Sequence, residues 1–319
     1  MKFSRIVSMF GPLKGPIRRY VIKRKLRFPK LISLELTNAC NARCIMCPRE
    51  QLTRKIGNMN TEIVEKVCRD SYKKPLKKMN LFGFGESLLY PRLVEVAKYI
   101  KQTLPYVELN LSTNAQLLNN GIADGLLRSG IDRINIDIDG AAKSTYEAVR
   151  KQLDYDVVVN NVKEFIKKRN QDNSKIKLSI TMIDMDITHN EIKSFKKMWT
   201  GLADEIFLNN YNTWAGIFTD RNINNKQLVR PSFPCKNLWR EMTINYNGKV
   251  SFCCMDFNST IIIGDVTKQS IEEIWHGEII GKLRKLHLEG KANEIPLCRN
   301  CNEYVFQSDS FWANLFIEQ

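Results

Sequence analysis

Hydrophobic positions along the chain follow two alternating periods between residues 31 and 208. Short runs of Leu, Ile and Val predict strands, and longer segments with apolar residues at every third or fourth position predict helices. The predicted strands cover residues 31–36, 78–84, 107–111, 133–138, 176–182 and 205–208. Each is followed by a helix or a crossover, which is typical of a parallel sheet with helices outside it. Because six repeats are found and not eight, we predict an α/β fold with a partial (β/α)6 TIM-like barrel.

Polar residues gather where the predicted strands end. Three cysteines follow the first strand, Gly83 and Glu86 the second, Ser112 and Asn114 the third, and an Asp pair that begins at Asp137 the fourth. The carboxyl ends of parallel strands meet at one edge of the sheet, where α/β proteins bind ligands. We therefore expect a functional site at this edge.

The hydrophobic pattern changes after residue 208. Residues 209–234 are rich in Asn and aromatic side chains, and we expect them to reach over the barrel mouth. From Cys235 onward, short predicted strands flank an Asn-Gly hairpin signal, and a helix over residues 271–288 precedes a final cysteine pair. The predicted organisation is a basic arm (1–30), the barrel (31–208), a connecting segment (209–234) and a small cysteine-anchored C-terminal domain (235–319).

Positive charge is concentrated at the start of the chain. The 319 residues carry a formal net charge of +15, and the first thirty contain ten Lys or Arg and no acid. We expect this basic arm either to contact an anionic surface (nucleic acid, a membrane surface or an acidic carrier) or to be a solvated face. A hydrophobic content of 43% excludes a disordered chain. Without an apolar run of 18 residues or a secretory signal, the protein is expected in the cytoplasm.

Nine cysteines carry the candidate chemistry. An odd number without a secretory signal argues against a disulfide framework and for metal binding or catalysis. Three of them, Cys40, Cys44 and Cys47, form a C-x3-C-x2-C motif. Three thiolates are one too few for a tetrahedral zinc site, but they suit a [4Fe–4S] cluster in which one iron lacks a protein ligand. The alternative is a zinc site that a distant His or Cys completes.

The residues around this motif resemble those of the radical S-adenosylmethionine (SAM) superfamily. The resemblance rests on residues 37–48 and on Gly83-Phe84-Gly85-Glu86, and it covers about residues 31–208. It implies that SAM binds the open iron through its amino and carboxylate groups. It also implies that the reduced cluster cleaves SAM into methionine and a 5′-deoxyadenosyl radical, which removes a hydrogen atom from an unactivated C–H bond.

The same resemblance implies a set of SAM contacts to the amino group, the carboxylate and the ribose. The implied set is Gly83, Gly85, Glu86, Ser112, Asn114, Asp137 and Arg150. Two residues depart from the family pattern, because Ser87 stands where Pro often follows the Glu and Met46 stands where an aromatic residue is common. Alternatives without a role in cofactor binding stay open: a simple turn for the glycines, a solvated loop for Glu86 and an exposed charge for Arg150.

Four of the cysteines after residue 234 are Cys235, Cys253, Cys298 and Cys301, and Gly248 precedes the second of them by five positions. This spacing resembles that of the auxiliary-cluster domain called SPASM, or of its shorter twitch form. A full SPASM domain needs seven cysteines, but only six lie outside the first motif, and one of these lies in the barrel. The resemblance therefore implies one auxiliary [4Fe–4S] cluster, and a four-thiolate structural zinc site is the alternative. The implied ligands are Cys235, Cys253, Cys298 and Cys301. The cofactors implied in total are two [4Fe–4S] clusters and SAM.

Two cysteines remain. Cys68 shares a predicted helix with Val64 and Val67, so we expect it in the core. Cys254 follows Cys253 directly, and in an extended segment its thiol would face the opposite way, so we expect it to pack and not to share a cluster. If either thiol faced the substrate, it would favour an epimerisation, in which the thiol returns a hydrogen atom.

A fully ligated cluster cannot hold SAM, but it can accept an electron from a substrate radical that has lost a proton. We therefore predict a radical SAM oxidoreductase that dehydrogenates an alcohol carbon of a sugar or aminocyclitol, as the single-auxiliary-cluster form implies. The expected partners are this substrate and an electron donor such as flavodoxin or ferredoxin. The alternatives are modification of a peptide or protein side chain and, from another class, a non-catalytic zinc protein that binds RNA through its basic arm. The sequence identifies no general base.

Overall fold

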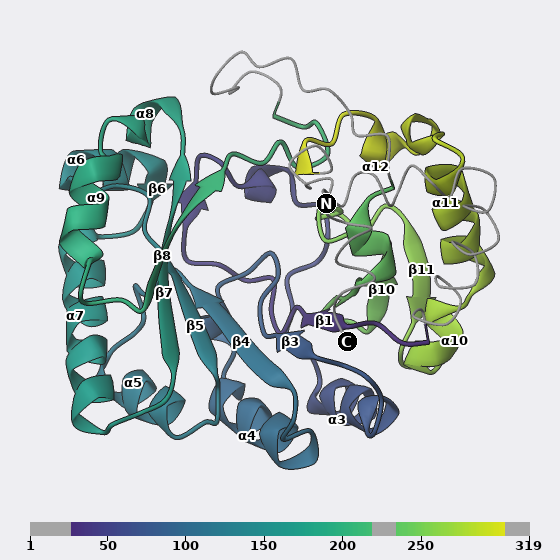
Figure 1. Ribbon diagram of the computed structural model, residues 1–319, viewed down its shortest axis with the longest axis horizontal. Coiled ribbons are helices and arrows are strands. Elements are labelled where there is room, and N and C mark those ends of the chain that lie inside the picture. The colour runs from purple at the N-terminus through teal and green to yellow at the C-terminus, as the bar shows by residue number, and fades with distance from the viewer. Residues whose placement is uncertain (1–26, 219–233, 304–319) are drawn as a thin grey trace, which may run out of the picture.

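The computed structural model describes residues 27–218 and 234–303 (Figure 1). Residues 1–26, which make up most of the basic arm, lie outside the described residues, as do residues 219–233 of the connecting segment and residues 304–319. The predicted anionic contact of the arm therefore stays a prediction. Within the part of the chain that the structure describes, none of the helices combines the length and the apolar character needed to span a bilayer.

Six parallel strands form the body of the fold. They are β1 (Leu31–Leu34), β3 (Lys78–Asn80), β4 (Glu108–Thr113), β5 (Arg133–Asp137), β7 (Lys177–Asp184) and β8 (Glu205–Asn210). They lie in the order β1-β3-β4-β5-β7-β8, and each pairs in parallel with the next. The sheet curves without closing into a full barrel (Figure 1). The predicted partial (β/α)6 barrel is confirmed.

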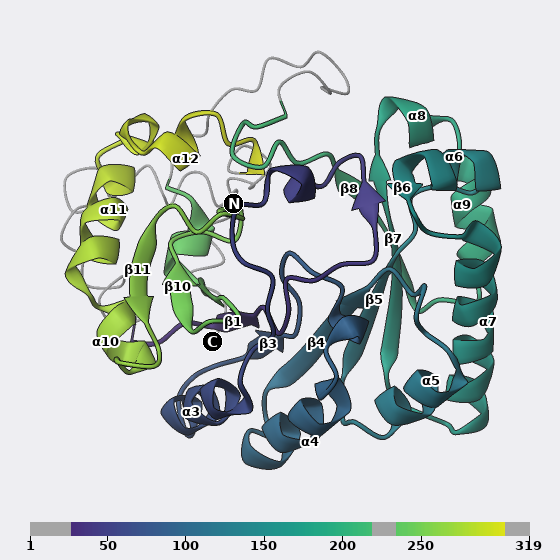
Figure 2. The ribbon, with the colours of Figure 1, turned by 180° about the vertical axis from the view of Figure 1, so that it is seen from behind.

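Helices cover the convex face of this sheet (Figures 1 and 2). The principal ones are α3 (Thr61–Ser71), α4 (Leu93–Thr103), α5 (Asn120–Leu127), α7 (Tyr155–Gln171) and α9 (Ile192–Trp199). The strands contribute an apolar face to this core. Ile32, Met79 and Leu109 stand in register on neighbouring strands, and all three are fully buried. Cys68 on α3 is also fully buried, which confirms its predicted place in the core.

The alternate residues of the same strands face the concave side and are polar. Ser33, Asn80 and Asn110 lie in register on β1, β3 and β4. Parallel sheets usually carry apolar residues on both faces, and barrel interiors are usually filled by bulky branched side chains. A polar concave face is therefore a feature that packing alone does not require.

The C-terminal part continues the same sheet. Its strands are β9 (Glu241–Ile244), β10 (Lys249–Ser251) and β11 (Ile262–Asp265). β9 runs parallel to β1, with Glu241 opposite Leu31, and β10 and β11 follow in antiparallel pairs. The result is one nine-stranded sheet in which the C-terminal part lies beside the first barrel strand (Figure 1).

The single helix predicted over residues 271–288 is two helices in the structure, α10 (Ile271–Trp275) and α11 (Glu278–Leu288). The prediction was wrong at Gly277, whose extended backbone begins α11. Shorter elements that the pattern did not predict complete the fold. They are β2 (Arg43–Cys44), β6 (Arg150–Lys151), α6 (Lys143–Val149), α8 (Asp186–His189), α12 (Pro296–Arg299) and the 3-10 helices η1 (Pro48–Gln51), η2 (Ser87–Leu89), η3 (Lys236–Trp239) and η4 (Ala292–Glu294).

Candidate functional site

The cysteine loop, residues 37–48, follows β1 at the carboxyl edge of the sheet. Its thiols at Cys40, Cys44 and Cys47 are all partly exposed, and they lie close enough together for one thiolate to raise the pKa of another. Cys44 lies in β2, which pairs with β6 so that Cys44 is opposite Arg150. Burial raises the pKa of all three thiols, that of Cys44 to about 12, although the Arg150 charge opposes this. A metal centre bound here would therefore have to displace protons from the thiols.

The donor set of the cysteine loop fits the cluster that the resemblance implies. Three thiols leave one iron of a [4Fe–4S] cluster without a protein ligand. Across the described ranges, no three His, Cys, Asp or Glu side chains meet as a single metal ion would require.

Glu86 is buried where the loop after β3 meets the cysteine loop. It is only 3% exposed, so the alternative of a solvated loop acid is wrong. Its Oε1 accepts hydrogen bonds from the Thr113 hydroxyl (2.6 Å) and from the Leu88 N–H (3.0 Å), and its Oε2 accepts one from the Asn114 N–H (2.8 Å). Burial raises the pKa of Glu86, and these three hydrogen bonds oppose that rise. The Glu86 N–H donates to the Ala39 carbonyl (2.8 Å), which ties the carboxylate to the cysteine loop.

Gly83 and Gly85 are required by the close approach of two loops. A Cβ on Gly83 would lie 2.7 Å from Cβ of Glu35, and a Cβ on Gly85 would lie 2.4 Å from the carbonyl oxygen of Thr37. Any larger residue would push the Glu86 loop away from the cysteine loop. The glycines therefore do more than form a turn, because they set the distance between the two predicted cofactor-binding loops.

Ser112 and Asp137 face each other from neighbouring strands. Asp137 on β5 accepts a hydrogen bond from the Ser112 hydroxyl (2.9 Å) through one oxygen and from the Thr181 hydroxyl (2.6 Å) through the other. Asn114, just past β4, donates its side-chain amide to Asn41 of the cysteine loop (2.8 Å). The structure thus brings these predicted residues together at one edge of the sheet.

Arg150 forms a buried ion pair that the sequence did not reveal. Its Nε and Nη2 lie 2.8 and 2.7 Å from Oδ2 of Asp139, and the second Asp139 oxygen accepts the Ile183 N–H at 2.6 Å. Burial acts against the Arg150 charge, but the carboxylate of Asp139 and the nearby Cys44 raise its pKa well above the usual value. Arg150 is only 9% exposed, so the exposed-charge alternative is wrong, and its partner Asp139 is fully buried.

The second cysteine group consists of Cys235, Cys253, Cys298 and Cys301, all partly exposed. Cys235 precedes η3, Cys253 follows β10, Cys298 lies in α12, and Cys301 comes just after it. His287 of α11 packs beside this group, and burial lowers its pKa to about 4. Four thiols from three separate segments are thus available for a fully ligated centre.

Strand alternation predicted that Cys254 points away from Cys253, and this prediction was wrong. β10 already ends at Ser251, so the two cysteines lie in a turn and alternation no longer applies. Interaction with the Cys253 thiol is the largest of several causes that raise the pKa of Cys254, and the nearby Glu241 carboxylate is another. Cys254 also accepts a weak hydrogen bond from the Asn237 amide (3.8 Å).

A row of polar side chains on the concave face was missed by the sequence. The Asn110 amide donates to Asn80 (3.2 Å), the Asn80 amide to Ser33 (3.2 Å) and the Ser33 hydroxyl to Glu241 (2.9 Å). This polar row (Glu241, Ser33, Asn80 and Asn110) crosses four strands and ends beside Cys254. No local sequence pattern predicts this polar row, because the row depends on the pairing of β9 with β1.

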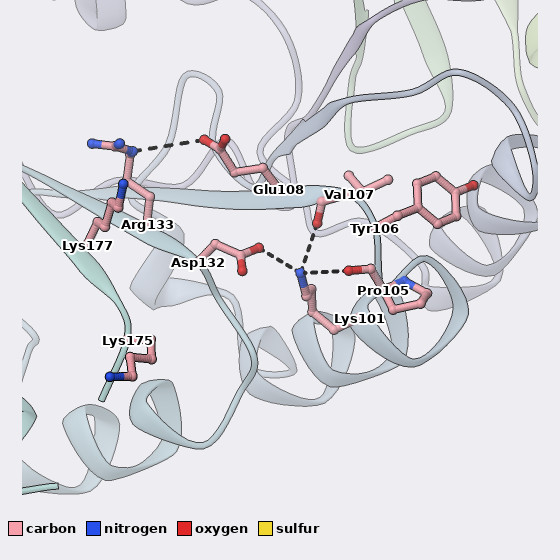
Figure 3. A pocket seen from close by; sticks show the side chains of 9 residues that line it. All are labelled: Lys101, Pro105, Tyr106, Val107, Glu108, Asp132, Arg133, Lys175 and Lys177. Carbon is pink, nitrogen blue, oxygen red and sulfur yellow. Dashed lines mark hydrogen bonds and ion pairs between the residues drawn. The ribbon is translucent and has the colours of Figure 1, made fainter. Parts of the chain in front are cut away.

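A separate hollow of about 340 Å³ lies at the opposite edge, near the amino ends of β4, β5 and β7 (Figure 3). Lys101 lines it and donates to Asp132 (2.7 Å) and to the Val107 carbonyl (2.9 Å). None of the predicted site residues lines this hollow, so it does not belong to the candidate site.

Comparison with known families and curated proteins gives two kinds of match. A model of the radical SAM superfamily matches residues 34–196, and a model of the SPASM iron–sulfur cluster-binding domain matches residues 235–302. The chain is similar to the S-adenosyl-L-methionine-dependent 2-deoxy-scyllo-inosamine dehydrogenase of Niallia circulans, with 22% identity over 88% of this chain and 95% of that protein. It is also similar to a probable GTP 3′,8-cyclase of Methanothermobacter thermautotrophicus, with 31% identity over 38% of this chain. That second match spans only 39% of the relative.

Solved structures share the fold at low sequence identity. The crystal structure of BtrN in complex with AdoMet and 2-DOIA has a TM-score of 0.59 and 19% identity, over 86% of this chain and 93% of BtrN. Streptococcus suis SuiB bound to its precursor peptide SuiA has a TM-score of 0.65 and 14% identity, over 89% of this chain and 72% of SuiB.

Proposed function

Because the chain belongs to the radical SAM superfamily and carries a SPASM iron–sulfur domain, we propose that it is an oxidoreductase that dehydrogenates an alcohol carbon of a sugar or aminocyclitol. Its cofactors are a [4Fe–4S] cluster, SAM and an additional iron–sulfur cluster. In the proposal, the thiols of the cysteine loop hold the SAM-binding cluster and the second cysteine group holds the additional one. An electron donor such as flavodoxin or ferredoxin supplies the reducing electron.

The observation that carries the substrate class is the polarity of the concave face. The polar row offers a carboxylate, a hydroxyl and two amides along one line of the sheet. The members of the row already pair with one another, but Asn110 Oδ1 is buried without a partner among the described residues. A molecule with several hydroxyl or amino groups can donate to it and to the remaining acceptors of the row, whereas an apolar molecule cannot. The similar dehydrogenase from Niallia circulans, whose name specifies an inosamine, supports the same class.

The predicted cofactor contacts are held in place by the protein itself. When bound, the reduced cluster and SAM supply a radical that takes a hydrogen atom from the substrate carbon. Glu86, fixed by three hydrogen bonds, presents carboxylate charge to the amino group of SAM. Asp137, oriented by two hydroxyls, accepts from ribose, and Arg150, oriented by Asp139, faces the SAM carboxylate.

The oxidation requires that the substrate also lose one proton and one electron. Glu241 is suited to accept the proton of the reacting hydroxyl, because it ends the polar row next to the second cysteine group. Burial raises its pKa, and the Ser33 hydroxyl only partly offsets this, so the carboxylate is a better base than an exposed one. When bound, the additional cluster would supply an acceptor for the electron.

Two other reactions remain candidates within the proposal. Radical SAM enzymes act on small molecules or on peptides, and SuiB, a neighbour in fold, binds a precursor peptide. Epimerisation is favoured by the Cys254 thiol, which lies beside Glu241 and carries a transferable hydrogen.

One experiment separates these reactions. The anaerobically reconstituted protein is incubated with SAM, a reductant and substrates deuterated at each alcohol carbon, with a variant that lacks the thiols of the cysteine loop as the control. Dehydrogenation predicts deuterium in 5′-deoxyadenosine and a product two hydrogens lighter than the protiated substrate. An isomer in which one deuterium has been replaced by hydrogen would indicate epimerisation, and turnover of peptides alone would refute the small-molecule assignment.

A further inference from the structure

His287 lies between two segments that carry cysteines of the second group. It belongs to α11 and is only 3% exposed. Its Nδ1 is 3.4 Å from the backbone nitrogen of Cys235, and its Nε2 is 3.4 Å from Sγ of Cys298. A single imidazole thus connects two segments that are far apart in the sequence.

The two contacts determine which ring nitrogen carries the proton. The backbone N–H of Cys235 can only donate, so Nδ1 of His287 must present its lone pair. The imidazole proton then lies on Nε2, which faces the sulfur of Cys298. The second hydrogen bond therefore runs from Nε2–H to Sγ.

The ring is positioned by the packing of its helix. Arg284, one turn earlier in α11, is buried and donates to the carbonyl of Leu238 (2.9 Å) and to that of Trp275 (2.7 Å). Its guanidinium also lies over the Trp275 ring, 4.2 Å from the centroid. Leu238 belongs to η3, which starts directly after Cys235. Arg284 thus fixes α11 against the segment that carries one of the two cysteines.

We propose that His287 is a positioning residue that donates a hydrogen bond to the Cys298 thiolate and raises the reduction potential of the additional cluster. This inference rests on the proposed function, which assigns Cys235 and Cys298 as ligands. A hydrogen-bond donor withdraws negative charge from a ligand sulfur and so stabilises the reduced state, which carries one more electron. The cluster becomes a better acceptor for the electron that the substrate loses.

The test uses the full chain with the three cysteines of the cysteine loop replaced by Ala, so that only the additional cluster is present. Iron content and the midpoint potential, followed by electron paramagnetic resonance, are measured for this parent and for His287→Leu and His287→Gln in the same background. We expect about four Fe per chain in all three. The potential should shift to more negative values in His287→Leu and return toward the parent in His287→Gln, whose amide again offers an N–H.

The matched control is His276→Leu, because His276 is exposed and its ring hydrogen-bonds to the Arg27 carbonyl (3.2 Å) and not to a residue of the second cysteine group. It should leave the potential unchanged. An unchanged potential in His287→Leu with the cluster intact would overturn the inference, whereas a parent without about four Fe would refute the ligand assignment instead.

A measurement on the unsubstituted His287 covers the case in which the variants lose the cluster. With ¹⁵N-labelled histidine, pulsed paramagnetic resonance of the reduced additional cluster should show one weak nitrogen coupling, as a hydrogen bond through sulfur gives. A strong coupling would make His287 an iron ligand, and no coupling would place it away from the cluster. Either result would overturn the proposed hydrogen bond.

Discussion

Replacing Glu86 by Gln tests the buried carboxylate at the centre of the site. In the wild type, Oε2 accepts the Asn114 N–H (2.8 Å), while Oε1 accepts from Thr113 and Leu88. The Gln amide can keep the contacts of Oε1, but it places an NH2 group against the Asn114 N–H. The variant loses one charge-assisted hydrogen bond, about 1.5 to 3 kcal/mol, and leaves a buried donor unsatisfied, about 1 to 3 kcal/mol.

Burial works in the opposite direction, because Gln carries no charge to desolvate and the pKa of Glu86 is raised by that desolvation. We therefore expect the free energy of unfolding of Glu86→Gln to fall by only about 2 kcal/mol, at the lower end of the hydrogen-bond terms. Loss of the charged partner of the SAM amino group should weaken SAM binding about 10- to 100-fold, the equivalent of about 1.4 to 2.8 kcal/mol.

Urea unfolding and equilibrium dialysis with SAM, both on the anaerobically reconstituted protein, measure these two effects. The control is Glu95→Gln on α4, where the pair with Arg92 is exposed to solvent, so neither stability nor SAM binding should change measurably. Folded Glu86→Gln protein that binds SAM like the wild type would refute the assigned contact. An unchanged free energy of unfolding would refute the hydrogen-bond argument.

Three further changes test other parts of the site. Replacing the three cysteines of the cysteine loop by Ala should lower the iron content from about eight to about four Fe per chain, measured by iron assay. It should also abolish 5′-deoxyadenosine formation, measured by chromatography. SAM cleavage by this variant would contradict the assignment. Gly85→Ala should destabilise the protein by about 1 to 3 kcal/mol in urea unfolding, because its Cβ would meet the Thr37 carbonyl at 2.4 Å, whereas Gly281→Ala, with open space around its Cβ, should not. Glu241→Gln should suppress substrate oxidation more than SAM cleavage. The pKa of Glu241 is raised by burial, so the folded wild type holds this proton more tightly than the unfolded chain does. The wild type therefore loses stability as pH rises above the usual carboxyl pKa. Glu241→Gln has no such proton to lose, so its stability relative to the wild type should increase over the same pH range. Equal pH slopes in urea unfolding would contradict that reasoning.

The elements that the sequence could predict are those with local signals. Strand and helix periods located the six barrel strands, and the residues just after them, such as Glu86, had to meet at one edge because parallel strands end together. Gly277 shows a signal that was present but overlooked, because the apolar period continues through it while the backbone does not.

The residues that could not be predicted depend on contacts between distant segments. Asp139 becomes the buried partner of Arg150 only because α6 returns the chain to the sheet edge. Glu241 joins the polar row only because β9 pairs with β1, some two hundred positions earlier in the chain. Strand alternation misplaced Cys254 for a similar reason, since the end of β10 is set by its partner strands and not by its own residues.

The pairing of β9 with β1 also explains how one fold can hold two cysteine groups at fixed positions. β1 leads into the cysteine loop, and β9 leads through β10 to Cys253, so backbone hydrogen bonds connect the two groups. A buried ion pair strengthens this connection: Arg54 binds both carboxylate oxygens of Glu35 at 2.6 Å and also the carbonyl of Phe257 (2.6 Å), while the Tyr246 N–H donates to Glu35 (3.3 Å). A reaction that takes a hydrogen atom at one centre and passes an electron to another needs a substrate held at a fixed place relative to both. The continuous sheet, which joins the two groups and carries the polar row, provides that rigidity.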